Sequence, residues 1–83
     1  MRRMIDDDQV PVPEGREDDE MPSNWAVTIV DDYDDAEPRV ALVVEEVGAA
    51  GTGFTLHLDA ARARRLRLAL ANALGELGEE PGR

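Results

Sequence analysis

The side chains that could form a hydrophobic core are confined to the middle and C-terminal parts of this 83-residue chain. Residues 1–24 carry eight acidic side chains, three arginines and three prolines, with few large apolar side chains. Segments of this kind bury too little apolar surface to offset the entropy that is lost on ordering. We therefore expect residues 1–23 to be a disordered acidic tail, residues 24–78 to be the folded domain, and residues 79–83 to be a frayed C-terminus.

Three segments of the expected domain have the composition of β-strands. Residues 25–30 and 39–47 are rich in β-branched side chains, and residues 54–58 alternate between apolar and polar side chains. An aspartate-rich loop at 31–38 and a glycine-rich connection at 48–53 separate them. Because short connections join neighbouring strands, the pattern favours an antiparallel meander.

One long helix is expected after the third strand. Asp59 stands at the N-cap position, residues 60–77 contain no proline, and Gly78 is a natural C-terminal stop. At helical spacing the apolar residues fall within an arc of ~100°; they are Ala63, Leu66, Leu70, Ala73, Leu74 and Leu77. The predicted fold is α+β, a three-stranded antiparallel β-meander followed by one C-terminal α-helix packed on one sheet face.

The opposite face of the predicted sheet is partly apolar and has no further element to cover it. Single-core domains below about 70–80 residues gain only about 3–5 kcal/mol of stability, and oligomerisation is a common remedy. We therefore expect a homodimer, or a stable complex with another protein, rather than a marginal monomer. The expected interface residues are Val30, Ala41, Val43, Val47 and Leu68.

Four arginines crowd the first two turns of the predicted helix, where the helix dipole disfavours cations; they are Arg62, Arg64, Arg65 and Arg67. Arginines beside free helix N–H groups suit an anion or an acidic partner. Three interpretations stay open. The arginines are solvated residues whose stems flank the apolar face, they bind the chain's own acidic tail, or they bind an external acidic partner.

Composition excludes several classes of protein. A net charge of −10 disfavours direct nucleic-acid binding, and the absence of cysteine excludes disulfides, zinc–thiolate sites and iron–sulfur clusters. No apolar run approaches the ~18 residues of a membrane span, and the basic start runs into aspartates rather than the apolar stretch of a signal peptide. We expect a cytoplasmic protein with no cofactor and no membrane contact.

Residues for catalysis or metal binding do not assemble into a recognisable set. The acidic loop at 31–37 lacks the spacing of a calcium-binding EF-hand, so it is interpreted as a solvated loop, with weak divalent-cation binding left open. His57 is the only histidine and Ser23 the only serine, and neither has catalytic partners nearby in the sequence. The glycine-rich connection has no phosphate-loop lysine. The chain is therefore not expected to be an enzyme.

The sequence favours a small acidic protein that acts in regulation by binding another protein. The alternative is an acidic inhibitor that imitates the charge of nucleic acid, of the anti-restriction or anti-CRISPR type, or an antitoxin that blocks its partner. A mimic requires carboxylates along a rigid surface, whereas eight of the acids are expected in a mobile tail. The interaction protein is therefore the preferred hypothesis.

Overall fold

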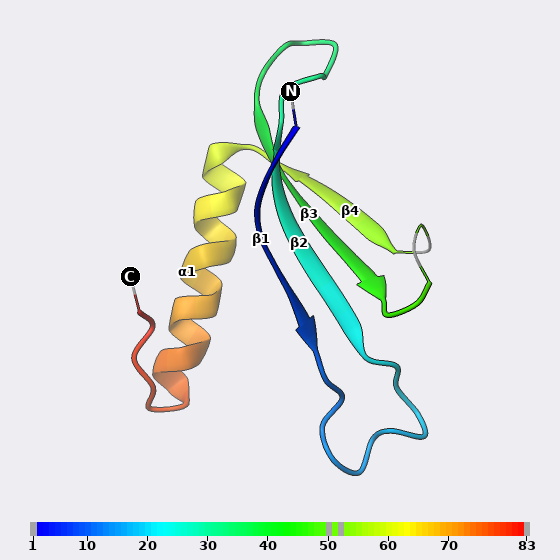
Figure 1. The fold of residues 1–83 in the computed structure, drawn as a ribbon. Helices are drawn as coiled ribbons and strands as arrows, with labels where there is room; N and C mark the ends of the chain where they lie inside the picture. The colour runs from blue at the N-terminus through cyan, green and yellow to red at the C-terminus, as the bar shows by residue number, and fades with distance from the viewer. Residues whose placement is uncertain (1, 50, 52, 83) are drawn as a thin grey trace.

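The computed structural model describes residues 2–49, 51 and 53–82, and it has an α+β fold with one antiparallel sheet and one C-terminal helix (Figure 1). The helix follows the last strand after a single residue, Asp59. In chain order the elements are β1 (Arg2–Val10), β2 (Ser23–Val30), β3 (Arg39–Glu46), β4 (Phe54–Leu58) and α1 (Ala60–Glu76).

The sheet has the strand order β1-β2-β3-β4, and every neighbouring pair is antiparallel. The meander that the sequence predicts for the three apolar strands is thus confirmed. Cross-strand pairs such as Val27 with Leu42 and Leu42 with Leu56 place the large apolar side chains of β2, β3 and β4 on one face. A second set alternates with it and lies on the other face.

The prediction of three strands is wrong, because residues 2–10 add a fourth strand where a disordered tail was expected. β1 pairs with β2 along its length, with one irregularity between Met4 and Asp6. All nine of its side chains are exposed, so its place depends on backbone hydrogen bonds to β2 rather than on apolar burial. The prediction of disorder was based on composition, which indicates whether a segment can bury apolar side chains. It does not indicate whether the segment can join the edge of a sheet through its backbone. In the following segment, turns replace the expected disorder, with an Arg16–Glu20 ion pair of 3.1 Å.

Two glycines allow the turn between β3 and β4 in the part of it that the structure describes. Gly48 has a φ of 82°, a conformation that glycine adopts without steric cost. A Cβ atom at Gly53 would overlap the backbone carbonyl of Val44, so only glycine fits at the start of β4. Ala50 and Thr52, which belong to the same predicted connection, lie outside the described residues.

Both predicted ends of the helix are confirmed. The Asp59 carboxylate accepts a hydrogen bond of 2.8 Å from the backbone N–H of Arg62, which satisfies a free donor of the first turn. At the other end Gly78 has a φ of 78°, and the Glu79 N–H donates to the Leu74 carbonyl at 2.9 Å. This pattern is a Schellman termination, which needs a left-handed residue just after the helix.

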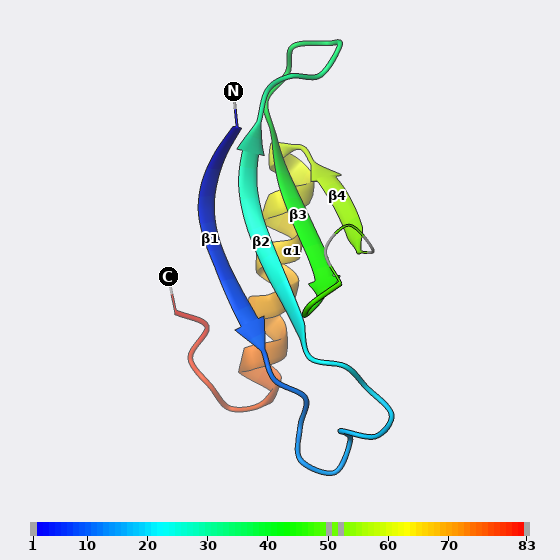
Figure 2. The same cartoon turned by 45° about the vertical axis from the view of Figure 1, so that its right-hand side comes forward.

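The helix lies over one face of the sheet (Figure 2), and its later turns diverge from the strands (Figure 1). No residue of α1 is buried, and the helix comes close to β3 and β4 alone among the described strands. Val30 and Ala41 are the only buried apolar residues in the described part of the chain. The radius of gyration is 14.9 Å, against about 12 Å for a compact chain of this length. The fold therefore leaves most of its apolar surface without a partner.

Candidate interaction surface

A groove of about 800 Å³ separates α1 from the sheet. Its floor consists of apolar side chains from β2, β3 and β4, namely Val27, Val40, Leu42 and Leu58. Toward the far end of β4, Leu56 and Phe54 share this face, and the Phe54 side chain is 80% exposed. A phenylalanine that meets water over most of its surface forgoes about 1.5–3 kcal/mol of burial. We call this apolar surface, together with the helix side that faces it, the open face.

The helix side of the groove includes part of the predicted apolar arc. Ala63, Leu66, Leu70 and Leu74 line the groove, whereas Ala73 and Leu77 do not, and Arg67 and Ala71 take part instead. The helix is thus turned about its axis relative to the prediction. As a result, several leucines on its flank meet solvent, with exposures of 37% for Leu66, 60% for Leu70 and 75% for Leu77.

The exposed flank of the helix has a regular spacing. Residues 66, 70, 73 and 77 follow one another at intervals of four, three and four, which is the spacing of the seam of a coiled coil. Three of the four are leucine and Ala73 is the fourth. We call these four residues the helix seam. Such a stripe buries its side chains against another helix, and no second helix is present in the described chain.

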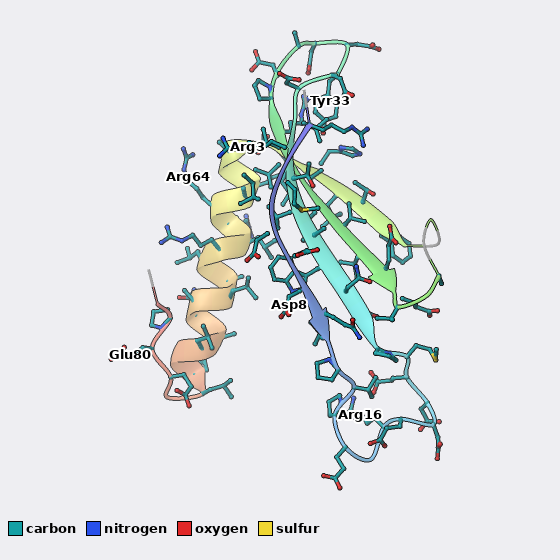
Figure 3. All side chains as sticks on the ribbon, viewed as in Figure 1. Arg3, Asp8, Arg16, Tyr33, Arg64 and Glu80 are labelled. Atoms are coloured by element: carbon teal, nitrogen blue, oxygen red, sulfur yellow. The ribbon has the colours of Figure 1, made fainter. Side chains whose placement is uncertain are left out.

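The predicted arginine cluster lies at the N-terminal half of α1, and it is exposed. Arg62 pairs with Asp59, the N-cap, at 2.9 Å. Arg64, Arg65 and Arg67 form no ion pair among the residues that the structure describes, and the acidic residues of β1 do not reach them. In Figure 3 the labelled Arg64 points away from the sheet. An internal partner in the N-terminal segment is therefore not seen, and three cations are left for solvent or for another molecule.

The residues expected at the interface are divided by the structure. Val30 and Ala41 are only 5% and 4% exposed, so they are already covered within the chain. Val43 and Val47 are half-buried, and Leu68 is exposed on the helix, where it lines both the groove and a shallower hollow. The face that was expected to lack a cover is thus the better closed of the two.

A polar cluster that the sequence did not reveal covers that face. The Tyr33 hydroxyl and the His57 Nδ1 share a hydrogen bond of 2.7 Å, and the two rings meet edge to face. The Arg39 guanidinium lies 4.7 Å from the centre of the Tyr33 ring and donates to both carboxylate oxygens of Asp35, at 3.1 and 2.6 Å. We call these four residues the Tyr33 cluster.

The register places the Tyr33 cluster beside the small core of Val30 and Ala41. Arg39 pairs with Val30 across β2 and β3, and His57 pairs with Ala41 across β3 and β4. Side chains of paired residues lie side by side on the same face. Tyr33 bridges Arg39 and His57, so it ties the loop between β2 and β3 to the neighbours of the two buried residues. The hydrogen bonds from Arg39 hold the pKa of the Asp35 carboxyl at about 2, below its ordinary value of 3.8.

The acidic residues are not arranged as a metal site in the part of the chain that is described. Among residues 2–49, 51 and 53–82, no three histidine or acidic side chains are grouped as they would be around a metal ion. Asp35 is engaged by Arg39, and Asp32 lies 3.7 Å from Arg2. The Ser23 hydroxyl approaches the Met21 carbonyl at 3.4 Å. No helix that the structure describes is long and apolar enough to cross a membrane.

Comparison of the chain with protein-family models, with curated proteins and with solved structures gives no match.

Proposed function

We propose that this chain is a small acidic protein without enzymatic activity, which acts by binding another protein chain and is a homodimer or a subunit of a complex. The observation that carries the proposal is the open face. Soluble monomers rarely leave a contiguous apolar patch of more than a few hundred Å² in water, and larger patches rimmed by polar residues mark interaction sites. Here the groove, the helix seam and Phe54 at the start of β4 form such a surface.

The apolar lining of the groove, with charged side chains only at its rim, supports a protein partner over a small ligand. Ligand pockets bury most of their occupant and present convergent polar groups. The side chains that line the groove are almost all aliphatic, and the two charged ones, Arg64 and Arg67, stand on its helix side. An elongated apolar surface with charges at its rim resembles the core and rim of a protein–protein interface.

The nucleic-acid mimic is less well supported. The acidic residues of β1 are held on a strand and not in a mobile tail, which removes one objection to it. However, Asp6 pairs with Val27 and Asp7 with Ala26, so consecutive carboxylates point to opposite faces of the sheet. Each face of the sheet therefore carries only one or two of the three β1 aspartates. This is fewer negative charges in a row than a nucleic-acid backbone presents.

Photo-cross-linking in the native host tests the proposed function. A photoreactive amino acid replaces Leu70 in the groove, and a matched variant carries it at Asn72, which lies on another side of the same helix. We expect the variant at position 70 to form a defined adduct with a protein chain, either a second copy or another protein. If position 70 gives no adduct beyond those of position 72, the proposed function is wrong.

A further inference from the structure

We propose that the open face is covered by a second copy of this chain, with the two α1 helices packed side by side in antiparallel orientation about a two-fold axis. This inference rests on the proposed function and specifies the partner. Each helix would place its seam against the seam of the other, and the pair would cover the parts of both sheets that a single helix leaves open.

The exposed area is the first argument. The chain exposes 6934 Å², whereas a compact monomer of 9.1 kDa is expected to expose about 4,900 Å². The excess is about 2,000 Å² per chain, and stable protein interfaces bury about 800 Å² per partner. A dimer that buried even half of the excess would reach the size of a stable interface, and the apolar character of this surface is typical of permanent dimers.

The helix seam is the second argument, because it has the symmetry that a two-fold axis requires. Its residues lie symmetrically about a point between Ala71 and Asn72, so an antiparallel copy places Leu66 against Leu77 and Leu70 against Ala73. Each large side chain at one end meets a large one, and at the centre a leucine meets an alanine. Interfaces of two-fold dimers are self-complementary in this way, since the same patch serves both subunits.

The distribution of charge along the helix is the third argument and sets the direction. The N-terminal half of α1 carries four arginines, and its C-terminal end carries Glu76, followed by Glu79 and Glu80. Figure 3 shows Arg64 near the start of the helix and Glu80 beside its other end. An antiparallel pair brings the arginines of each copy to the level of the acidic end of its partner. It also sets opposite helix dipoles side by side, which offsets the unfavourable position of the arginines.

The lack of cysteine in the chain permits a direct test by disulfide cross-linking. Single variants Leu66→Cys and Leu77→Cys are mixed in equal amounts, allowed to exchange subunits, and oxidised. Both positions are exposed in the single chain, so we expect the variants to fold. The control is Asn72→Cys, which lines the shallower hollow and not the groove, and which has no residue of the helix seam three or four positions away. Sedimentation of the parent protein at ~100 µM, well above the dissociation constant of a stable dimer, accompanies the cross-linking.

Antiparallel pairing predicts that the parent sediments as a dimer, that the main product joins position 66 to position 77, and that Asn72→Cys gives little product. Main products of 66 with 66 and 77 with 77 would show a parallel pair and overturn the proposed arrangement. A dimer without any of these cross-links would show that another surface associates, which also overturns it. A monomeric parent would overturn the second copy as partner, while a position-70 adduct with a different protein would still support the proposed function.

Discussion

The two faces of the sheet differ in how far the chain completes its own packing. On one face Arg39 and His57 of the Tyr33 cluster lie beside Val30 and Ala41, which are almost fully buried. On the other face the side chains are much larger and the cover is a whole helix, yet Phe54 and Leu70 remain mostly in water. The face with the smaller apolar side chains is therefore the one that the chain buries more completely.

The means of attachment explains this difference. Tyr33 is fixed by a hydrogen bond to His57 and by the guanidinium of Arg39, so specific contacts hold the loop at several points. The helix is joined to β4 through Asp59 alone, and no described hydrogen bond or ion pair links its later turns to the sheet. Because the helix is attached to the described strands only at its first turn, the leucines of its later turns stay exposed to solvent. The first face is thus held by contacts within the chain, whereas the second leaves apolar side chains exposed, and it is the face on which we propose that a partner binds.

The largest expected effect comes from a charge on the open face. Leu70→Asp places a carboxylate in the centre of the helix seam, and an unpaired charge that is buried in an interface costs several kcal/mol. We expect the dissociation constant of the dimer to rise on the order of 100-fold or more, which corresponds to about 2.7 kcal/mol. Analytical ultracentrifugation over a range of concentrations measures this change.

The control for this prediction is Asn72→Asp, which adds the same charge to the same helix at a position that lines neither the groove nor the helix seam. It should leave the dissociation constant nearly unchanged. Equal weakening by both variants would mean that net charge, and not the seam, governs association. An unchanged dimer in Leu70→Asp would show that the open face is not the interface.

A smaller effect is expected on the closed face. Tyr33→Ala removes the ring that bridges Arg39 and His57, together with one aromatic contact and one cation–π contact. We expect the free energy of unfolding to fall by about 1–3 kcal/mol, since each of these contacts contributes about 0.5–1.5 kcal/mol and the small core is uncovered as well. Urea denaturation measures the loss, and the dissociation constant of the dimer should stay the same.

Tyr33→Phe separates the ring from its hydroxyl. It keeps the ring contacts and removes only the hydrogen bond to His57, so most of the stability should return. If Tyr33→Phe were as damaging as Tyr33→Ala, the hydrogen bond rather than the covering ring would hold the loop. If Tyr33→Ala weakened association as strongly as Leu70→Asp, the two faces would not be independent.

Local patterns in the sequence predicted most of the fold and little of the candidate site. The three apolar strands, the Asp59 cap and the Gly78 stop follow from side-chain alternation and from backbone rules that act within a few residues. β1 was missed because an edge strand is held by hydrogen bonds to the free backbone groups of its neighbour. These bonds do not depend on side chains, so the sequence of an exposed acidic segment does not reveal them. The helix was expected to pack on one face of the sheet. Amphipathic spacing predicts that one side of a helix is apolar, but it does not predict whether that side packs against the same chain or against another one.

The Tyr33 cluster could not be predicted, because Tyr33 and His57 are 24 residues apart in the chain and meet only through the register of β3 and β4. One signal was present: Asp35 and Arg39 stand four residues apart on either side of Pro38, a spacing that allows an ion pair. Val30 and Ala41 were predicted at the interface from the alternation of side chains alone. Alternation predicts which face of the sheet a residue lies on, but it does not predict whether other parts of the chain bury it. The sequence therefore identified both faces of the sheet, but it did not show that Val30 and Ala41 are already buried within the chain.

Acid titration offers a third way to examine the closed face. Arg39 donates two hydrogen bonds to Asp35 and lowers the pKa of that carboxyl to about 2 in the folded chain, against 3.8 ordinarily. Because the folded pKa lies below the unfolded one, the stabilisation is fully present above pH 3.8 and is lost as the pH falls from 3.8 toward 2. Asp35→Asn should lack this part of the acid dependence, which thermal melts at a series of pH values measure.

The matched control for the titration is Asp34→Asn, a neighbouring position that forms no ion pair in the described part of the chain. Its stability should follow that of the parent between pH 3.8 and 2. The difference between parent and Asp35→Asn is small because the carboxylate is exposed, and surface ion pairs contribute little. A parent and an Asp35→Asn variant with parallel acid curves would mean that the Arg39 contact does not persist in solution.

The smallest expected effect concerns the backbone of the loop that closes this face. Ala36 has a φ of 58°, and its N–H donates to the Tyr33 carbonyl at 3.0 Å. A left-handed conformation costs an ordinary residue about 1–2 kcal/mol, while glycine adopts it freely but loses about 0.5–1 kcal/mol more entropy on folding. Ala36→Gly should therefore raise the free energy of unfolding by roughly 0.5 kcal/mol, from the balance of those two costs. Ala26→Gly in β2, where the backbone is extended, should lower it by a similar or larger amount, and urea denaturation of both variants gives the comparison. A loss of stability in both would show that Ala36 is not held in the left-handed region, and that the loop is less firmly fastened by the Tyr33 cluster than its contacts indicate.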